Sequence, residues 1–157
     1  METMRVALGS DHAGFQLKAV LASTLTRWGY EVVDLGTRDA STSVDYPDFG
    51  EAVGRSVAAG DCDVGVAVCG SGIGISIAAN KVPGVRAALV HDVTSARLAR
   101  EHNHANVLCF GSRLIGELVA IDALEAWLNA TPQDRHSGRI EKLHALDERP
   151  TEERQFQ

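Results

Sequence analysis

The stretch VGVAVCGSGIGISIAANK, residues 64–81, carries the clearest structural signal in the chain. Its first part, Val64–Val68, is a short apolar run of the kind that forms a strand buried on both faces. The loop Cys69–Gly74 follows, with glycine at every second position from Gly70, and leads into a helix-like segment. A strand that turns through glycines into a helix predicts an α/β fold with an anion-binding site at the turn.

Four further apolar runs alternate with amphipathic stretches along the chain. The runs are Arg5–Leu8, Glu31–Leu35, Ala87–Val90 and Val107–Phe110, and helical spacing covers Phe15–Trp28, Phe49–Ala59, Val93–His102, Leu114–Leu128 and Ile140–Leu146. Strand–helix repeats place helices on both faces of a parallel sheet. The pattern therefore predicts a Rossmann-like three-layer α/β/α sandwich with a five-stranded parallel sheet and a C-terminal helix. Val64–Val68 is expected inside the sheet rather than at its edge.

Residues 1–157 are expected to form a single domain, because 157 residues suit one core and the alternation is continuous. Two segments interrupt the pattern. Gly36–Pro47 is a polar connection long enough for a functional loop, and the charged tail Asp147–Gln157 is expected to be flexible.

Composition and charge restrict the class of partner. The chain has a formal net charge of −6, which disfavours indiscriminate binding to nucleic acid or anionic membranes. It contains no apolar run of membrane-spanning length and no secretory leader, so we expect a cytoplasmic protein. Three cysteines without metal-ligand spacing predict no metal site, and Cys62 and Cys109 are interpreted as core residues.

The carboxyl ends of parallel strands meet at one rim of a sheet, where ligands bind. The segments expected at this rim are Gly9–His12, Cys69–Gly74, His91–Asp92 and Gly111–Arg113. Cys69 stands at the mouth of the glycine loop, where the N-terminus of a helix favours the thiolate. An anion hole beside a thiolate suits proton transfer next to a carbonyl group. Asp11 beside His12 is a pair that can fix the tautomer of the imidazole.

Nucleotide binding fits the two glycine-containing loops poorly. A dinucleotide fingerprint starting at Gly70 requires Gly or Ala where Ile75 stands, and it normally follows the first strand. The segment Gly9–Gly14 has the glycine spacing of a phosphate-binding P-loop. It continues with Phe15 and Gln16 where that motif has lysine and a hydroxyl residue.

Two further groups near the ends of helices can carry chemistry. His102 and Asn103 end the helix that begins at Val93, where a histidine is either a simple cap or a proton relay. The segment Arg135–Arg139 gathers positive charge in an acidic protein, and arginine suits phosphate, although a solvated helix start remains the alternative.

Taken together, six segments resemble the type B ribose-5-phosphate isomerase family, which also includes galactose- and allose-6-phosphate isomerases. They are Gly9–Phe15, Asp45–Pro47, Cys69–Lys81, Ala99–Asn103, Gly111–Arg113 and Arg135–Arg139, and the likeness runs over roughly residues 5–146. The resemblance implies that Cys69 is the catalytic base. Relatives with glycine at that position use a glutamate six residues later, where this chain has Ile75, so it resembles the cysteine subgroup.

The same resemblance assigns the other site residues. It implies sugar ring opening by His102 aided by Asp11, and phosphate binding by His12, Arg113, Arg135 and Arg139. Tyr46 and Asn103 match positions that line the substrate pocket. The family works without a metal or another cofactor, as homodimers or homotetramers with shared active sites. In these assemblies the equivalents of Arg135 and Arg139 commonly come from the other subunit.

The expected reaction is aldose–ketose isomerisation of a sugar phosphate through an enediolate. Cys69 moves the proton, and Gly70, Gly72, Gly74 and the Ser71 hydroxyl help to bind the oxyanion. Ribose 5-phosphate is the expected substrate, with allose 6-phosphate, galactose 6-phosphate or a tetrose phosphate as alternatives. Two other classes stay open: a thiol hydrolase or transferase, which would form a covalent adduct on Cys69, and a non-enzymatic sugar-phosphate sensor.

Overall fold

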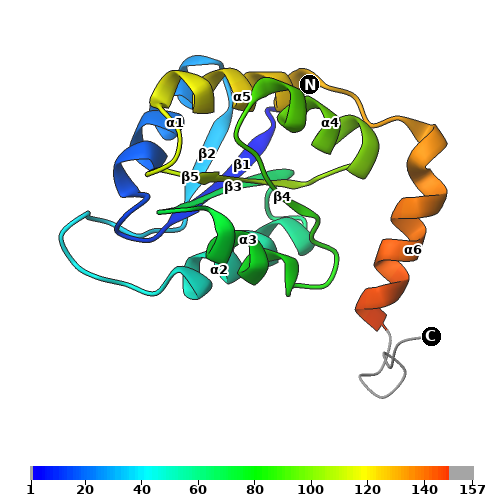
Figure 1. Ribbon diagram of the computed structural model, residues 1–157, viewed down its shortest axis with the longest axis horizontal. Coiled ribbons are helices and arrows are strands. Elements are labelled where there is room, and N and C mark those ends of the chain that lie inside the picture. The colour runs from blue at the N-terminus through cyan, green and yellow to red at the C-terminus, as the bar shows by residue number, and fades with distance from the viewer. Residues whose placement is uncertain (1, 149–157) are drawn as a thin grey trace.

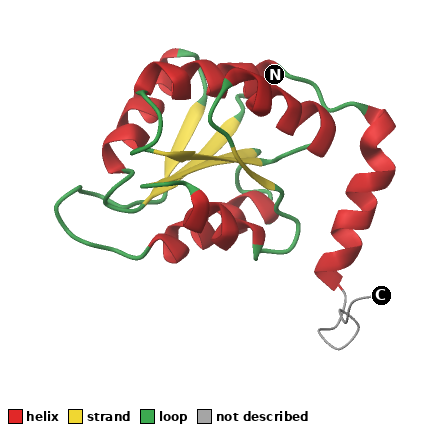
Figure 2. Ribbon diagram, in the orientation of Figure 1, coloured by secondary structure: helices red, strands yellow, loops and turns green. Residues whose placement is uncertain are grey.

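The computed structural model describes residues 2–148, and it contains the predicted five-stranded parallel sheet (Figures 1 and 2). The strands are β1 (Arg5–Ser10), β2 (Glu31–Asp34), β3 (Val64–Cys69), β4 (Ala87–Leu89) and β5 (Val107–Gly111). They pair in the order β2-β1-β3-β5-β4, and every pair is parallel. Strand β3 therefore lies at the centre of the sheet, as the apolar run Val64–Val68 predicts.

Helices cover both faces of the sheet, which confirms the three-layer prediction (Figure 2). The helices are α1 (Phe15–Arg27), α2 (Tyr46–Ala58), α3 (Ile73–Asn80), α4 (Val93–Asn103), α5 (Glu117–Asn129), the short 3₁₀ turn η1 (Asp134–His136) and α6 (Ser137–Glu148). Helices α1, α4 and α5 lie on one face, and α2 and α3 lie on the other (Figure 1).

The core is divided between these two faces because successive side chains of a strand point to opposite sides. Leu8 and Phe110 pack with Leu21 and Trp127 of the helices on one face. On the other face, Ala67, Cys69 and Cys109 pack with Val53 of α2 and Ile75 of α3. The central strand is buried along its whole length. Such double-sided burial explains why the strands are continuously apolar instead of alternating.

Two helices are longer than their periodicity predicts. Helix α2 begins at Tyr46 rather than Phe49, because Pro47 occupies the first turn, where its fixed φ suits a helix and its missing N–H costs nothing. Helix α6 runs from Ser137 to Glu148. It therefore includes the first two residues of the predicted tail, and Asp147 accepts a hydrogen bond from Gly84 N at 2.8 Å. Residues 149–157 of that tail lie outside the described residues.

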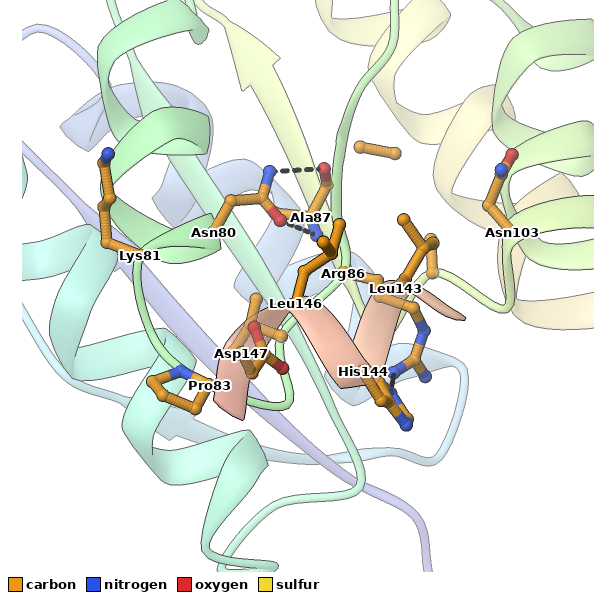
Figure 3. A pocket seen from close by; sticks show the side chains of 13 residues that line it. Asn80, Lys81, Pro83, Arg86, Ala87, Asn103, Leu143, His144, Leu146 and Asp147 are labelled. Atoms are coloured by element: carbon orange, nitrogen blue, oxygen red, sulfur yellow. Dashed lines mark hydrogen bonds between the residues drawn. The ribbon is translucent and has the colours of Figure 1, made fainter. Parts of the chain in front are cut away.

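Helix α6 stands apart from the three layers, beyond the edge strand β4 (Figure 1). A cavity of about 510 Å³ separates it from the body. Figure 3 shows Asn80 and Lys81 on one side of this cavity, Asn103 on another, and Leu143 and His144 of α6 below. None of the helices within residues 2–148 is long and apolar enough to cross a membrane.

Candidate active site

The loops that follow β1, β3 and β5 are joined by hydrogen bonds at the carboxyl rim of the sheet. Asp11 N donates to Val68 O at 3.3 Å, and Ser112 N and Arg113 N donate to Cys69 O and Gly70 O at 2.9 and 3.0 Å. The Ser112 hydroxyl adds a bond to Ala13 O at 2.8 Å. The predicted gathering of these three strand ends at one rim is confirmed.

Cys69 is the last residue of the central strand, and its side chain is buried with 4% exposure. Its sulfur accepts a hydrogen bond from Gly72 N at 3.2 Å. Gly72 precedes the first turn of α3 and has φ of 75°, a left-handed conformation that favours glycine. The glycine turn thus directs a backbone donor and the positive end of a helix at the sulfur. The sulfur therefore lies where backbone dipoles converge at the carboxyl rim.

The other two cysteines have no such surroundings. Cys62 and Cys109 are buried free thiols in the apolar cluster beneath α2 and α3, as their core interpretation predicts. Burial raises the pKa of Cys109, and the charge of nearby Cys69 raises it further, so Cys109 stays protonated. Within residues 2–148, His, Cys, Asp and Glu side chains form no group of three that could hold a metal ion.

Two side chains flank the glycine loop, and two of its glycines make room for them. A Cβ atom at Gly74 would lie 2.4 Å from Cζ of Tyr46, so the Tyr46 ring lies directly against the start of α3. At the other end of the loop, a Cβ atom at Gly70 would lie 3.3 Å from Nη1 of Arg113. Arg113 is exposed, which leaves its guanidinium accessible to an anion beside the loop.

Ser71 lies between these two contacts and is partly exposed. Its hydroxyl oxygen accepts a hydrogen bond from Ile73 N at 3.2 Å. A hydroxyl that accepts in this way keeps its own proton to donate. Gly72 N and Ile73 N therefore donate hydrogen bonds within the loop, to the Cys69 sulfur and the Ser71 hydroxyl. The sequence alone does not distinguish these two N–H groups from the other possible ligand donors of the loop.

Asp11 and His12 have different partners, and the expectation that Asp11 orients His12 is wrong. The buried Asp11 carboxylate accepts from Gly14 N at 3.0 Å and so shapes the turn into α1. His12 Nδ1 instead accepts from the backbone N–H of Val44 at 3.2 Å. Because Nδ1 is an acceptor, the neutral imidazole carries its proton on Nε2. Val44 lies in the polar segment between β2 and α2, which the sequence marks only as a long loop.

The remaining predicted residues form a second group at the end of α4. Arg135 Nη2 lies 3.4 Å from His102 Nε2, and the rings of His102 and His136 have centroids 4.5 Å apart. Arg139 Nη1 lies 3.1 Å from Nδ1 of His136. Asn103, the last residue of α4, lines the cavity next to α6.

This second group lies at the opposite edge of the sheet from Cys69. Helix α4 ends at Asn103, just before Val107 begins β5, whereas Cys69 pairs with Gly111 at the end of β5. Four residue steps along a strand cover about 13 Å. One copy of the chain therefore brings together Asp11, His12, Cys69, Ser71 and Arg113, but it does not bring His102, Arg135 or Arg139 to them.

His136 is the member of this group that sequence reasoning leaves without a role. Its side chain is buried, and its Nε2 has no hydrogen-bond partner within residues 2–148. Burial lowers its pKa, and the positive charges of Arg135, His102, Arg139 and His104 lower it further. The only signal in the sequence is its position between two arginines of the segment Arg135–Arg139.

Known proteins resemble this chain over nearly its whole length. The family model for Ribose/Galactose Isomerase matches residues 6–143. Ribose-5-phosphate isomerase B of Escherichia coli is 44% identical over 146 residues, which are 92% of this chain and 97% of that protein. Galactose-6-phosphate isomerase subunit LacB of Clostridium acetobutylicum is 42% identical over 127 residues, which are 81% of this chain and 73% of that protein.

Solved structures extend this likeness to three dimensions. The ribose-5-phosphate isomerase B structure of Clostridium thermocellum has a TM-score of 0.90 and 48% identity, and the match covers 92% of this chain and 97% of that one. The type B ribose 5-phosphate isomerase structure of Trypanosoma brucei has a TM-score of 0.88 and 45% identity. That match covers 92% of this chain and 99% of the other. With both its fold and its sequence matching, the chain belongs to the ribose/galactose isomerase family.

Proposed function

We propose that this protein interconverts ribose 5-phosphate and ribulose 5-phosphate, with Cys69 as the base. The hydrogen bond from Gly72 N to the Cys69 sulfur carries the proposal, because it fixes the sulfur beside the glycine loop at the rim where ligands of parallel sheets bind. The relatives of matching length named ribose-5-phosphate isomerase B support an aldose–ketose isomerase.

The proton transfer uses groups of the glycine loop. The Cys69 thiolate removes the proton from C2 of the open-chain aldose, and the electron pair moves to the C1 carbonyl oxygen, which takes up a proton. Loss of the proton from the 2-hydroxyl then forms the C2 carbonyl, and the thiol returns its proton to C1. Gly70 N, Gly74 N and the Ser71 hydroxyl are the proposed donors to the oxyanion, while Gly72 N serves the sulfur. One such donor contributes about 3–4 kcal/mol in a transition state.

Phosphate binding is assigned to N–H donors from both edges of the sheet, three of them arginines. His12 presents Nε2–H because Val44 N occupies its Nδ1, and the exposed Arg113 lies beside Gly70. Arg135 and Arg139 are the proposed second pair. Binding energy at the phosphate, away from the reacting carbons, positions the sugar for proton transfer.

The active site is proposed to form between two copies of the chain. His102, which opens the sugar ring with the help of Asp11, lies about 13 Å or more from the Cys69 end of the sheet. A partner related by two-fold symmetry can bring its own His102, Asn103, Arg135 and Arg139 to Cys69. Ile73 and Ile77 on α3 and Leu143 on α6 are exposed apolar side chains, and burial in a homodimer or homotetramer would cover them.

The substrate is tested by comparing kcat/KM for ribose 5-phosphate, allose 6-phosphate and galactose 6-phosphate. We expect ribose 5-phosphate to be preferred. The relative named galactose-6-phosphate isomerase subunit makes the hexose phosphate the second candidate. Preference for a hexose or tetrose phosphate would contradict the pentose assignment but keep the isomerase. A covalent Cys69 adduct trapped during turnover would instead point to a thiol hydrolase or transferase.

A further inference from the structure

Helix α1 carries a lysine on its buried face. The side chain of Lys18 is 1% exposed, and it lies among Leu17, Leu21 and Leu25, where the spacing of the helix calls for an apolar residue. Its ammonium group lies 2.5 Å from Asp34 Oδ1 and 2.7 Å from Thr37 O, and 5.5 Å from the centre of the Phe15 ring. A buried ammonium is costly unless it is paired, and here it has partners on two sides.

The partners of Lys18 fasten the beginning of the loop between β2 and α2. Asp34 Oδ1 also accepts from Gly36 N at 2.9 Å. Gly36 O accepts from Ser10 N, and Thr37 N donates to Ser10 O, both at 2.8 Å. Lys18 therefore holds the start of this loop from the side of α1, while the loop's own backbone bonds to Ser10 hold it at the end of β1, directly before Asp11 and His12.

The other end of the loop holds His12 itself. Val44 N donates to His12 Nδ1 at 3.2 Å, and residues 38–43 between the two anchors are exposed. The loop extends beyond the carboxyl rim as a long excursion between β2 and α2 (Figure 1). Val44 directly precedes Asp45, the N-cap of α2, so its backbone N–H is placed by the start of α2 on one side and by the anchored start of the loop on the other.

Stability alone gives a weak reason for a lysine at this position. The Asp34 side chain is 50% exposed, so the pair gains little from its mutual attraction while Lys18 loses its hydration. An apolar side chain of similar length would fill the same space on α1. An apolar side chain could not donate hydrogen bonds to Asp34 Oδ1 and Thr37 O at the same time, as the Lys18 ammonium does.

We propose that Lys18 is a positioning residue for His12. Through Asp34 and Thr37 it sets the start of the loop, and through Val44 the loop fixes the imidazole with Nε2–H directed to the phosphate of the substrate. This inference rests on the proposed function, because it takes His12 as a phosphate ligand. It adds a residue that does not touch the substrate and does not move a proton.

The test compares Lys18→Met with the wild-type protein and with Leu25→Val, a buried change two turns further along the same helix. In Lys18→Met, we expect KM for ribose 5-phosphate and Ki for inorganic phosphate to rise about tenfold, with kcat within about twofold. Nitrogen-15 NMR of the ring of His12 should show a mixture of tautomers instead of Nε2–H alone. Leu25→Val should lower thermal stability and leave KM, Ki and the tautomer unchanged.

Asp34→Asn provides a second route should Lys18→Met fail to fold, because the amide keeps the shape of the side chain and its oxygen can still accept from the Lys18 ammonium. It removes the charge that pairs with Lys18 and weakens the acceptor of Gly36 N, so a smaller rise in KM and a partly mixed tautomer are expected. Wild-type KM together with an unchanged His12 tautomer in the folded variants would overturn the inference. A wild-type protein without isomerase activity would contradict the proposed function instead, and the tautomer and the phosphate affinity would still test Lys18.

Discussion

The backbone N–H of Gly72 lies 3.2 Å from the sulfur of Cys69, three residues back along the glycine turn. This contact links the fold to the chemistry. The turn that starts α3 can form only with a residue that accepts a positive φ at position 72, and the same turn gives the sulfur a donor. The backbone groups around the sulfur are held in place by the fold and need no reorganisation during the reaction.

Replacing the base tests its role directly. Cys69→Ser should lower kcat by about 10²–10⁴-fold and change KM little, because serine fits the space but does not ionise near neutral pH. Steady-state kinetics with ribose 5-phosphate measure both constants. Near-normal kcat in this variant would show that another group removes the proton.

The turn itself can be tested through folding. In Gly72→Ala, the new Cβ would lie 2.5 Å from Leu89 Cδ1, 2.7 Å from the carbonyl carbon of Phe110 and 2.9 Å from Gly111 N. The positive φ adds strain of its own, so we expect a loss of about 2–4 kcal/mol in the free energy of unfolding. Gly116→Ala is the matched control, since nothing lies within 4 Å of its Cβ position. Urea denaturation should place that control within about 1 kcal/mol of the wild type, since Gly116 is the N-cap of α5 and alanine is less favoured there than glycine.

Much of this architecture can be predicted from the sequence because its strands are short, apolar and separated by regular helices. The strand Val64–Val68 is central as expected, and the strand ends at Asp11, Cys69 and Arg113 meet at one rim. Residues at strand ends are placed by topology alone, so no side-chain detail is needed to group them.

The partner of His12 and the burial of Lys18 are harder to predict. Val44 acts through a backbone N–H, which every residue but proline has, in a loop without periodicity. Lys18 occupies a position on the buried face of α1, but lysine is rarely buried, so the sequence suggests a solvated side chain there. The separation of His102 from Cys69 does follow from topology, because a crossover helix runs back against its strands and ends at their amino edge.

We expect the buried His136 to make the stability of the protein depend on pH. Its pKa is lowered below the ordinary 6.5, so around that pH the unfolded chain binds a proton that the folded chain does not. Stability should therefore fall as pH decreases through 6.5 towards the lower folded-state pKa, and the contribution should be complete above 6.5. Denaturation of the wild type and of His136→Asn at several pH values isolates this contribution. Equal pH slopes for the two proteins would contradict it.

Ring opening by His102 can be separated from proton transfer by the choice of substrate. His102→Asn should turn over ribose 5-phosphate slowly, because the furanose must open before Cys69 can reach the C2 proton. An aldotetrose 4-phosphate lacks the free hydroxyl that closes such a ring, so any turnover of it should be about equal in variant and wild type. If both substrates are affected to the same degree, His102 has a role in proton transfer or in folding instead.

A mixture of two impaired variants tests whether His102 and Cys69 act across a subunit interface. In a two-fold dimer with shared sites, a heterodimer of Cys69→Ser and His102→Asn has one site with both changes and one with neither. Random mixing makes half of the dimers heterodimers, so about a quarter of the wild-type activity should return after the variants are unfolded and refolded together. Each variant refolded alone is the control and should keep its low activity on ribose 5-phosphate. Because Cys69 and His102 lie at opposite edges of one sheet, absence of complementation in a mixture shown to contain heterodimers would mean that a single chain must rearrange to bring them together.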